Sequence, residues 1–146
     1  MNNLVKNLED ILPHSHPMIL IDKLIEADAQ NNLVKCSVTV SEDKILYDKN
    51  IEGICALAGI EFMAQSAGCY MWVKNNMQKP KIGYLLGSRA YRCNLEKFEL
   101  GKTYIITAQQ VFNDNELVSF NCFIYNGNEE CARATINVYQ PKSAQA

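Results

Sequence analysis

The stretch from Ile51 to Val73 constrains the fold more than any other part of the chain. It contains many large apolar residues with Ala and Gly between them, and its strongly polar residues are Glu52, Glu61, Gln65 and Ser66. A segment of this length that is apolar on nearly every face is typical of a helix buried on nearly all sides. We therefore expect one long central helix with the rest of the chain packed around it.

Strand-like segments flank this stretch on both sides. Two precede it (18–25 and 33–40) and four follow it (82–93, 103–112, 117–125 and 130–139), each with β-branched or aromatic residues. Turns that contain Gly, Asn or Asp separate the last four, and such short connections favour antiparallel pairing. These elements predict an α+β fold in which a curved antiparallel sheet of about six strands wraps around one long central helix.

The remaining segments complete one predicted domain over residues 1–146. Apolar residues at helical spacing predict a short amphipathic helix over residues 1–12, which Pro13 ends. The polar tail over residues 141–146 is expected to be frayed. With 146 residues, 48% of them hydrophobic, the chain is long enough to bury one sizeable core.

Charge and cysteine usage exclude several classes of function. A formal net charge of −2, with acidic and basic residues interspersed, gives no overall field for nucleic-acid binding. The six cysteines form no CxxC pair, so we expect free, mostly buried thiols, with neither a zinc site nor a nucleophilic cysteine. No Gly-rich phosphate loop or dinucleotide fingerprint occurs, which predicts no bound cofactor.

Two features bear on where the protein works. The N-terminal region includes Glu9 and Asp10 and lacks a basic start followed by an apolar run, so no secretory signal is predicted. A carboxylate in the middle of a membrane span, here Glu61, costs about 2.5–3.5 kcal/mol on insertion scales, which argues against a membrane helix. We expect a cytoplasmic protein, whose thiols stay reduced.

Glu61 is the residue that most directly suggests chemistry. A carboxylate within an apolar helix loses hydration unless it meets a partner or opens onto a pocket. Desolvation favours the protonated form, which suits a general acid or base, but a Glu that only hydrogen-bonds a neighbouring strand or subunit fits the pattern equally well. Gln65, one turn later on the same face, is a candidate to orient Glu61 or a ligand carbonyl, with an amide satisfied by backbone as the commoner alternative.

The two histidines, His14 and His16, lie in a turn bounded by Pro13 and Pro17. Histidine is the usual proton carrier near neutral pH, but a histidine in a turn is more often exposed to solvent than catalytic. Their position alone is therefore weak support for a catalytic base. Asp22 ends the apolar run that follows and is expected to form a surface salt bridge.

Three motifs in order resemble the β-hydroxyacyl-ACP dehydratases of the hotdog fold. Their N-terminal motif is similar to Leu12-Pro13-His14 followed by Met18-Ile19-Leu20-Ile21-Asp22, and their central-helix motif is similar to Glu61-Phe62-Met63-Ala64-Gln65. The strand whose glycine amide meets the thioester carbonyl is similar to Gly83-Tyr84-Leu85-Leu86-Gly87, continued by Ala90-Tyr91-Arg92. The resemblance covers nearly the whole chain and implies a hotdog fold.

The resemblance also implies a reaction, the dehydration of a 3-hydroxyacyl group on acyl carrier protein. Glu61 is then expected to donate a proton to the departing hydroxyl. The Gly87 amide and a helix N-terminal amide near Ala56 are expected to polarise the thioester carbonyl. Gln65 joins them as a substrate-binding candidate.

One departure from the family concerns the base. Family dehydratases carry a catalytic histidine in the loop before the central helix, where this chain has Tyr47. A divergent branch, the dehydratase-like proteins associated with aryl polyene synthesis, is similar in keeping the Pro-His motif and the helix glutamate without that histidine. We therefore predict His14 as the base and membership in that branch.

Two other functions fit the same sequence. A helix carboxylate above an acyl pocket can activate water and hydrolyse an acyl-CoA or acyl-ACP thioester, and a chain without the loop histidine can be a non-catalytic acyl-binding subunit paired with an active homologue. The resemblance implies a homodimer or heterodimer with another hotdog subunit, and acyl carrier protein bearing phosphopantetheine as the partner. Basic residues after the helix offer local attraction for the acidic carrier, or are ordinary solvated charges: Lys79, Lys81, Arg89, Arg92 and Lys97.

Overall fold

The computed structural model describes residues 2–3, 8–12, 17–75, 84–114 and 116–139. One antiparallel sheet has seven strands in the order β1-β2-β3-β8-β9-β10-β6, and a second has three in the order β4-β5-β7. The large sheet consists of β1 (Asn2–Asn3), β2 (Lys23–Asp28), β3 (Leu33–Thr39), β8 (Thr103–Asp114), β9 (Leu117–Asn126), β10 (Glu129–Tyr139) and β6 (Tyr84–Cys93). The small sheet consists of β4 (Tyr47–Asp48), β5 (Gly53–Cys55) and β7 (Lys97–Glu99).

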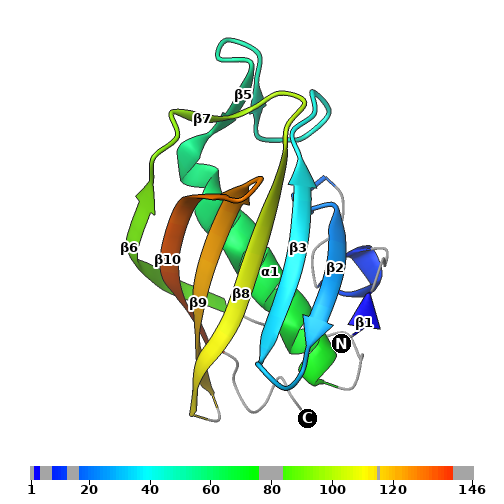
Figure 1. Ribbon diagram of the computed structural model, residues 1–146, viewed down its shortest axis with the longest axis vertical. Helices are drawn as coiled ribbons and strands as arrows, with labels where there is room; N and C mark the ends of the chain where they lie inside the picture. The colour runs from blue at the N-terminus through cyan, green and yellow to red at the C-terminus, as the bar shows by residue number, and fades with distance from the viewer. Residues whose placement is uncertain (1, 4–7, 13–16, 76–83, 115, 140–146) are drawn as a thin grey trace.

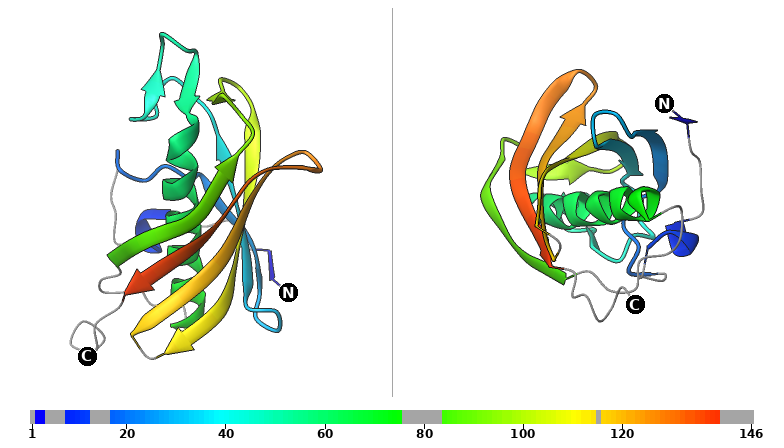
Figure 2. Two further views of the ribbon diagram at one scale, coloured as in Figure 1. Left: turned by 90° about the vertical axis from the view of Figure 1, so that its left-hand side faces the viewer. Right: turned by 90° about the horizontal axis from the view of Figure 1, so that it is seen from below.

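One α-helix, α1 (Gly59–Lys74), lies against the concave face of the large sheet (Figure 1). Seen from below, the sheet curls around α1, with the β6 edge on one side of the helix and β2 on the other (Figure 2). Short 3-10 turns precede the first long strand and the helix, at Leu8–Asp10 and Ala56–Ala58. The predicted curved antiparallel sheet around one helix is confirmed.

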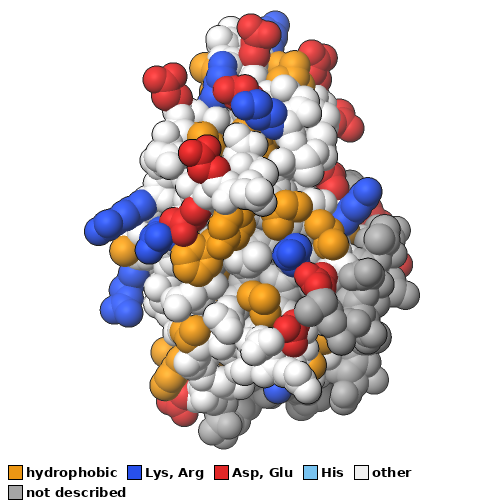
Figure 3. Space-filling model, in the orientation of Figure 1, with side chains coloured by type: hydrophobic (Ala, Val, Ile, Leu, Met, Phe, Trp, Pro, Cys, Tyr) orange, Lys and Arg blue, Asp and Glu red, His pale blue; other side chains and the backbone are white. Residues whose placement is uncertain are grey.

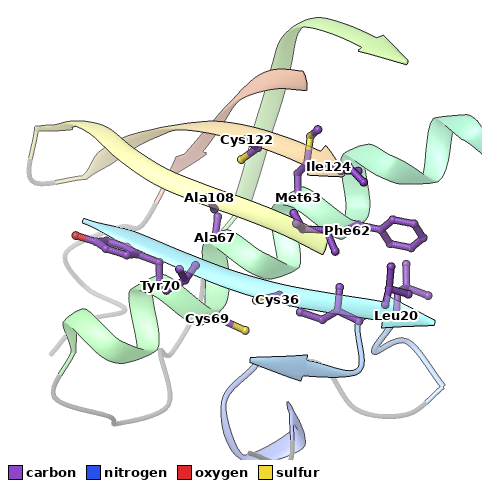
Figure 4. Close-up of a cluster of buried hydrophobic side chains, with 14 of the residues drawn as sticks. Leu20, Cys36, Phe62, Met63, Ala67, Cys69, Tyr70, Ala108, Cys122 and Ile124 are labelled. Atoms are coloured by element: carbon purple, nitrogen blue, oxygen red, sulfur yellow. The ribbon is translucent and has the colours of Figure 1, made fainter. Parts of the chain in front are cut away.

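The core forms where α1 meets the sheet. Ala67 points toward Ala108 of β8 and Met63 toward Ile124 of β9 (Figure 4), and all four side chains are fully buried. Aromatic rings extend the core toward the small sheet, because the Phe98 ring packs edge-on at 5.1 Å from Phe62 and at 5.0 Å from Tyr104, centroid to centroid. Apolar burial of this kind is the main stabilising contribution to such a fold.

The central helix is shorter than the sequence predicts. Residues 53–55 form β5, which pairs with β4 and β7, and α1 begins only at Gly59. The prediction of helix over residues 51–58 is therefore wrong. A short apolar run fits a buried strand as well as a helix, so the sequence pattern could not distinguish the two. The pairing of β5 with β7 requires a residue without a Cβ at Gly53, because a Cβ there would lie 2.4 Å from the backbone oxygen of Phe98.

The N-terminal region also departs from expectation. Asn2 and Asn3 pair with Ala27 and Glu26 as β1, and Leu8–Asp10 forms a single 3-10 turn, so the predicted helix over residues 1–12 is wrong for these described residues. The strand expected over 18–25 begins only at Lys23. The other long strands lie within two residues of their predicted ends, and the tail over 141–146 lies outside the described residues.

The thiols agree with their prediction for the most part. All six cysteines are free, and four of them are buried: Cys36, Cys69, Cys122 and Cys131. Burial raises the pKa of the Cys131 thiol to about 11, so this thiol stays protonated at neutral pH. Cys55 is an exception, because it is exposed.

The outer face of the sheet carries a mixed surface. Figure 3 shows hydrophobic side chains gathered near the middle of this face, with charged side chains around them. Phe123 and Tyr125 of β9 are half-buried there, and the Arg133 guanidinium lies 5.5 Å from the centroid of the Phe123 ring. Among the described helices, α1 included, none is long and apolar enough to cross a membrane.

Candidate functional site

The start of α1 is the structural centre of the candidate site. β5 leads into the turn Ala56–Ala58, which continues directly into α1, and Cys55 at the N-cap position makes no side-chain capping bond. The first backbone N–H groups of a helix have no acceptor within it, and the helix dipole adds partial positive charge. This uncapped start therefore presents donors of the kind predicted near Ala56, which is half-buried.

Glu61 lies in the first turn of α1, and its side chain is exposed. The expectation that its carboxylate is buried is therefore wrong for the single chain. The cause is the position on the helix, since Phe62 and Met63 face the core and are 0% exposed, whereas Glu61 lies on the face that the sheet does not cover. Two turns later the same face is covered, because a Cβ at Gly68 would lie 2.8 Å from Leu12 Cδ2.

Apolar side chains are also exposed around the start of α1. Leu57, one turn before Glu61, is 69% exposed. The segments 44–52 and 97–101 lie beside each other at the same end, where the Leu100 N–H donates to the Glu52 carbonyl. They and the helix start carry these large exposed hydrophobic residues: Ile45, Leu46, Ile51, Leu57 and Leu100. In the single chain, the exposed Glu61 therefore lies one turn after the exposed Leu57, at the end of the molecule that carries these apolar side chains.

Gln65 is buried and its amide is committed to the backbone. Its Oε1 accepts from the N–H of Leu20 at 2.8 Å and more weakly from that of Ile21 at 3.4 Å. Its Nε2 donates to the Met18 carbonyl at 2.9 Å. The alternative of an amide satisfied by backbone is thus what the structure shows, and Gln65 holds residues 18–21 against α1.

This clamp acts on the segment directly after the two histidines. His14 and His16 lie outside the described residues, so the assignment of His14 as base stays a prediction. Asp22, at the end of the clamped segment, pairs with Lys44 and accepts the Thr39 N–H at 2.6 Å. The predicted salt bridge of Asp22 is present, and it ties the segment before β4 to the large sheet.

Tyr47 occupies the place of the family's loop histidine and lies on β4. Burial, helped by the nearby carboxylates Glu42, Glu52 and Asp48, raises the pKa of its phenol above the ordinary value. A phenol with a raised pKa is neutral at physiological pH and serves as a hydrogen-bond donor rather than as a base. Tyr47 therefore does not take over the role of the missing histidine.

Gly87 lies on β6, an edge strand of the large sheet as far as the structure describes it. It pairs with Asn137, and the register then shifts so that Val138 pairs with Leu85. Apart from its two chain neighbours, no atom of the residues that the structure describes lies within 4 Å of the place where a Cβ of Gly87 would be. The Gly87 backbone is therefore approachable, as the predicted contact with a thioester carbonyl requires.

Sequence reasoning missed the role of Tyr91 in this region. The Tyr91 hydroxyl donates to the carbonyl of Ala56 at 2.5 Å, which ties β6 to the start of α1. The only available signal was that Ala90-Tyr91-Arg92 follows Gly87 in the family pattern, and this assigns no contact to the tyrosine. A bond between residues 35 positions apart depends on the fold and cannot be read from spacing.

The basic residues predicted to attract the acidic carrier differ in how available their charges are. Arg89 and Arg92 of β6 are exposed, whereas the Lys97 ammonium donates to the carbonyl of Ile51. Lys79 and Lys81 lie outside the described residues. Within the described part of the chain, no group of three His, Cys, Asp or Glu side chains is arranged to hold a metal ion.

A family model for ApeP-like proteins, described as ApeP dehydratase, matches residues 6–146. The chain belongs to the ApeP-like dehydratase family. This ApeP-like chain is therefore a dehydratase-type lyase by family, and the predicted divergent branch is confirmed.

Three relatives match almost the whole ApeP-like chain. In "The Dehydratase Heterocomplex ApeI:P from Xenorhabdus doucetiae", one chain superposes with a TM-score of 0.84 at 28% identity, covering 99% of this chain and 96% of that one. The 3-hydroxyacyl-[acyl-carrier-protein] dehydratase FabZ of Wolbachia sp. subsp. Brugia malayi is 28% identical over 138 residues, covering 90% of this chain and 92% of the relative. FabZ of Acinetobacter baylyi is 23% identical over 147 residues, with 97% of both chains covered.

More distant structures share the fold alone. The HP0420 homologue from Helicobacter felis superposes with a TM-score of 0.66 at 10% identity, and zebrafish thioesterase superfamily member 2 with 0.62 at 12%. At such identities the likeness carries no information on reaction or substrate. Together with the ApeI:P match, these neighbours confirm that the ApeP-like chain has the hotdog fold.

Proposed function

We propose that this chain is a subunit of a dehydratase that removes water from a 3-hydroxyacyl group carried as a thioester on acyl carrier protein. The product is a 2-enoyl thioester in a fatty-acid-like or aryl polyene synthesis. The observation that carries the proposal is the match of the ApeP dehydratase model to residues 6–146, supported by FabZ relatives that span nearly the whole chain. The carboxylate and the uncapped amides at the start of α1 supply fitting groups.

The reaction needs a base, an acid and a polarised carbonyl. In our proposal His14 takes the proton from the carbon next to the thioester, and the electron pair forms the carbon–carbon double bond. The hydroxyl on the next carbon leaves with a proton from Glu61 as water. The Gly87 amide and an amide at the start of α1 near Ala56 stabilise the negative charge that develops on the thioester oxygen.

The Glu61 carboxyl must be shielded from solvent before it can act as a protonated acid. In the single chain its side chain is exposed, beside Leu57, which is 69% exposed. A second hotdog subunit, identical or homologous, that covers this apolar surface would desolvate the carboxyl and favour its protonated form. The edge strand β6 offers backbone groups for such pairing, and the ApeI:P neighbour is described as a heterocomplex.

Acyl carrier protein is the proposed carrier of the substrate, and its acidic surface fits the exposed cations of β6. Arg89 and Arg92 both lie on this strand with exposed side chains. Charges at the rim of an interface mainly raise the rate of association, so we expect them to guide the carrier rather than to set its affinity. Lys97 is bound to the Ile51 carbonyl and contributes less.

The proposed location is the cytoplasm. None of the six cysteines is paired, and buried thiols such as Cys122 and Cys131 have pKa values raised by desolvation. Free thiols in this number are typical of proteins in a reducing compartment.

The decisive experiment separates dehydration from hydrolysis and tests the need for a second subunit. The purified chain, alone and in complex with its co-purifying hotdog subunit, is incubated with 3-hydroxyacyl-ACP. Enoyl-ACP and free thiol are then quantified by mass spectrometry. We expect enoyl-ACP from the complex and little from the chain alone. Release of free thiol without enoyl product would refute the dehydratase, and full activity of a monodisperse monomer would refute the proposed cover.

A further inference from the structure

We infer that Tyr91 is a positioning residue that holds the Ala56–Leu57 peptide so that the Leu57 N–H is presented at the open start of α1. The inference rests on the proposed function, because it names the donor that meets the thioester carbonyl. A peptide unit is planar and trans, so fixing the direction of the Ala56 carbonyl also fixes the opposite direction of the Leu57 N–H. Tyr91 acts on that carbonyl.

The Ala56 carbonyl is saturated by two donors. It accepts the Tyr91 hydroxyl at 2.5 Å and the Gly59 N–H, which closes the turn before α1. Hydrogen bonds that share one peptide unit polarise one another, so a carbonyl with two donors makes its own peptide N–H a stronger donor. The Tyr91 bond therefore both orients and strengthens the Leu57 N–H.

The chain distorts β6 to deliver this hydroxyl. Arg133 pairs with Arg92 and Thr135 with Arg89, so two residues of β6, Ala90 and Tyr91, face one residue of β10. Ala90 takes a φ of 55°, a left-handed conformation that is unfavourable for any residue with a Cβ. Such bulges re-aim a side chain, and here Tyr91 is turned to pack against the core beside α1.

The helix makes room for the same hydroxyl. A Cβ at Gly59 would lie 2.2 Å from the Tyr91 hydroxyl oxygen and 3.1 Å from the carbon that bears it. Gly59 is also buried, so a larger residue has no space to turn away. Two independent features, a strained bulge in β6 and a glycine in α1, thus converge on one hydrogen bond.

The chemistry of Tyr91 fits positioning and not proton transfer. Burial is the main cause that raises the pKa of its phenol, followed by the neighbouring thiol of Cys93, so the phenol stays protonated at any working pH. Its single O–H is committed to the Ala56 carbonyl. Tyr91 therefore holds the donor in place and does not itself touch the reacting atoms.

The test compares Tyr91→Phe with Tyr125→Phe, a matched control on the outer face of β9. In the active complex with 3-hydroxyacyl-ACP, Tyr91→Phe should lower kcat roughly three- to tenfold with little change in KM, the effect of losing one hydrogen bond. In the NMR spectrum of the backbone amides, the Leu57 N–H resonance should shift in the direction expected for a weaker hydrogen-bond donor. The control should change neither quantity.

Gly59→Ala tests the hydrogen bond between the Tyr91 hydroxyl and the Ala56 carbonyl by a second substitution. It should displace the tyrosine hydroxyl and lower kcat, and the double variant with Tyr91→Phe should lose less than the product of the two single losses. A Tyr91→Phe variant with unchanged kcat and an unmoved Leu57 resonance would overturn the inference, even if its melting temperature falls. If the wild-type complex forms no enoyl product, the proposed function fails, and the Leu57 resonance alone decides the role of Tyr91.

Discussion

Replacing Gln65 with Leu removes the clamp that holds residues 18–21 against α1. Leu has a similar size and a good helix propensity, so the change isolates the loss of the amide. The Leu20 N–H and the Met18 carbonyl lose partners at 2.8 and 2.9 Å. Gln65 itself is only 2% exposed, so water does not readily replace it.

The cost follows from the number of groups left unpaired. A buried polar group without a partner costs about 1–3 kcal/mol, and the Met18 carbonyl is only partly buried, so we expect a total loss of about 2–4 kcal/mol. For a chain of this size each kcal/mol lowers the melting temperature by about 2–4 °C. The expected drop is thus on the order of 5–15 °C.

The assay is thermal and urea unfolding followed by circular dichroism. Ser66→Ala is the matched control, because Ser66 is also buried but its hydroxyl donates within the helix to the Phe62 carbonyl. That variant should change the free energy of unfolding by less than about 1 kcal/mol. An equal loss in both variants, or a loss below about 1 kcal/mol for Gln65→Leu, would refute the clamp.

Two further predictions concern the sheet. Ala90→Gly should raise the free energy of unfolding by about 0.5–1 kcal/mol in urea titrations, because glycine adopts the left-handed conformation freely; Ala108→Gly in a regular buried strand should lower it, and a loss in both would contradict the strain at Ala90. The pKa of Cys131 is raised from 9.0 to about 11, so its contribution to stability is complete below pH 9 and is lost as the pH rises to about 11. Unfolding measured across this range should show a smaller decline in Cys131→Ala than in the wild type, and parallel curves would contradict the assignment.

Hydrophobic periodicity predicted the long strands well because each buries one face against α1. The alternation in residues 103–112 and 117–125 corresponds to β8 and β9, whose buried residues alternate along each strand. The short elements were not predictable in this way. β5 is only Gly53–Cys55, and it is a strand because Ile54 pairs with the nearby Tyr47 on one side and with Phe98, from a distant part of the chain, on the other.

The candidate site could be predicted in residue identity but not in environment. Their polarity within an apolar helix singled out Glu61 and Gln65, but in the structure Glu61 is exposed and Gln65 is buried. Sequence periodicity tells which face of a helix is apolar, but not whether the sheet, the N-terminal segment or a second subunit covers it. The role of Tyr91 could not be predicted for a related reason, because its partner Ala56 is brought near only by the packing of β6 against the start of α1.

The most direct test of Glu61 as the proton donor is the rate of dehydration by Glu61→Gln in the complex with its second subunit. Glutamine keeps the size of the side chain but has no carboxyl proton to give, so we predict that kcat falls by roughly 100-fold or more. Glu129→Gln, an exposed carboxyl at the start of β10, serves as the control and should retain wild-type turnover. Turnover of 3-hydroxyacyl-ACP at the wild-type rate by Glu61→Gln would contradict the assignment of Glu61 as the proton donor.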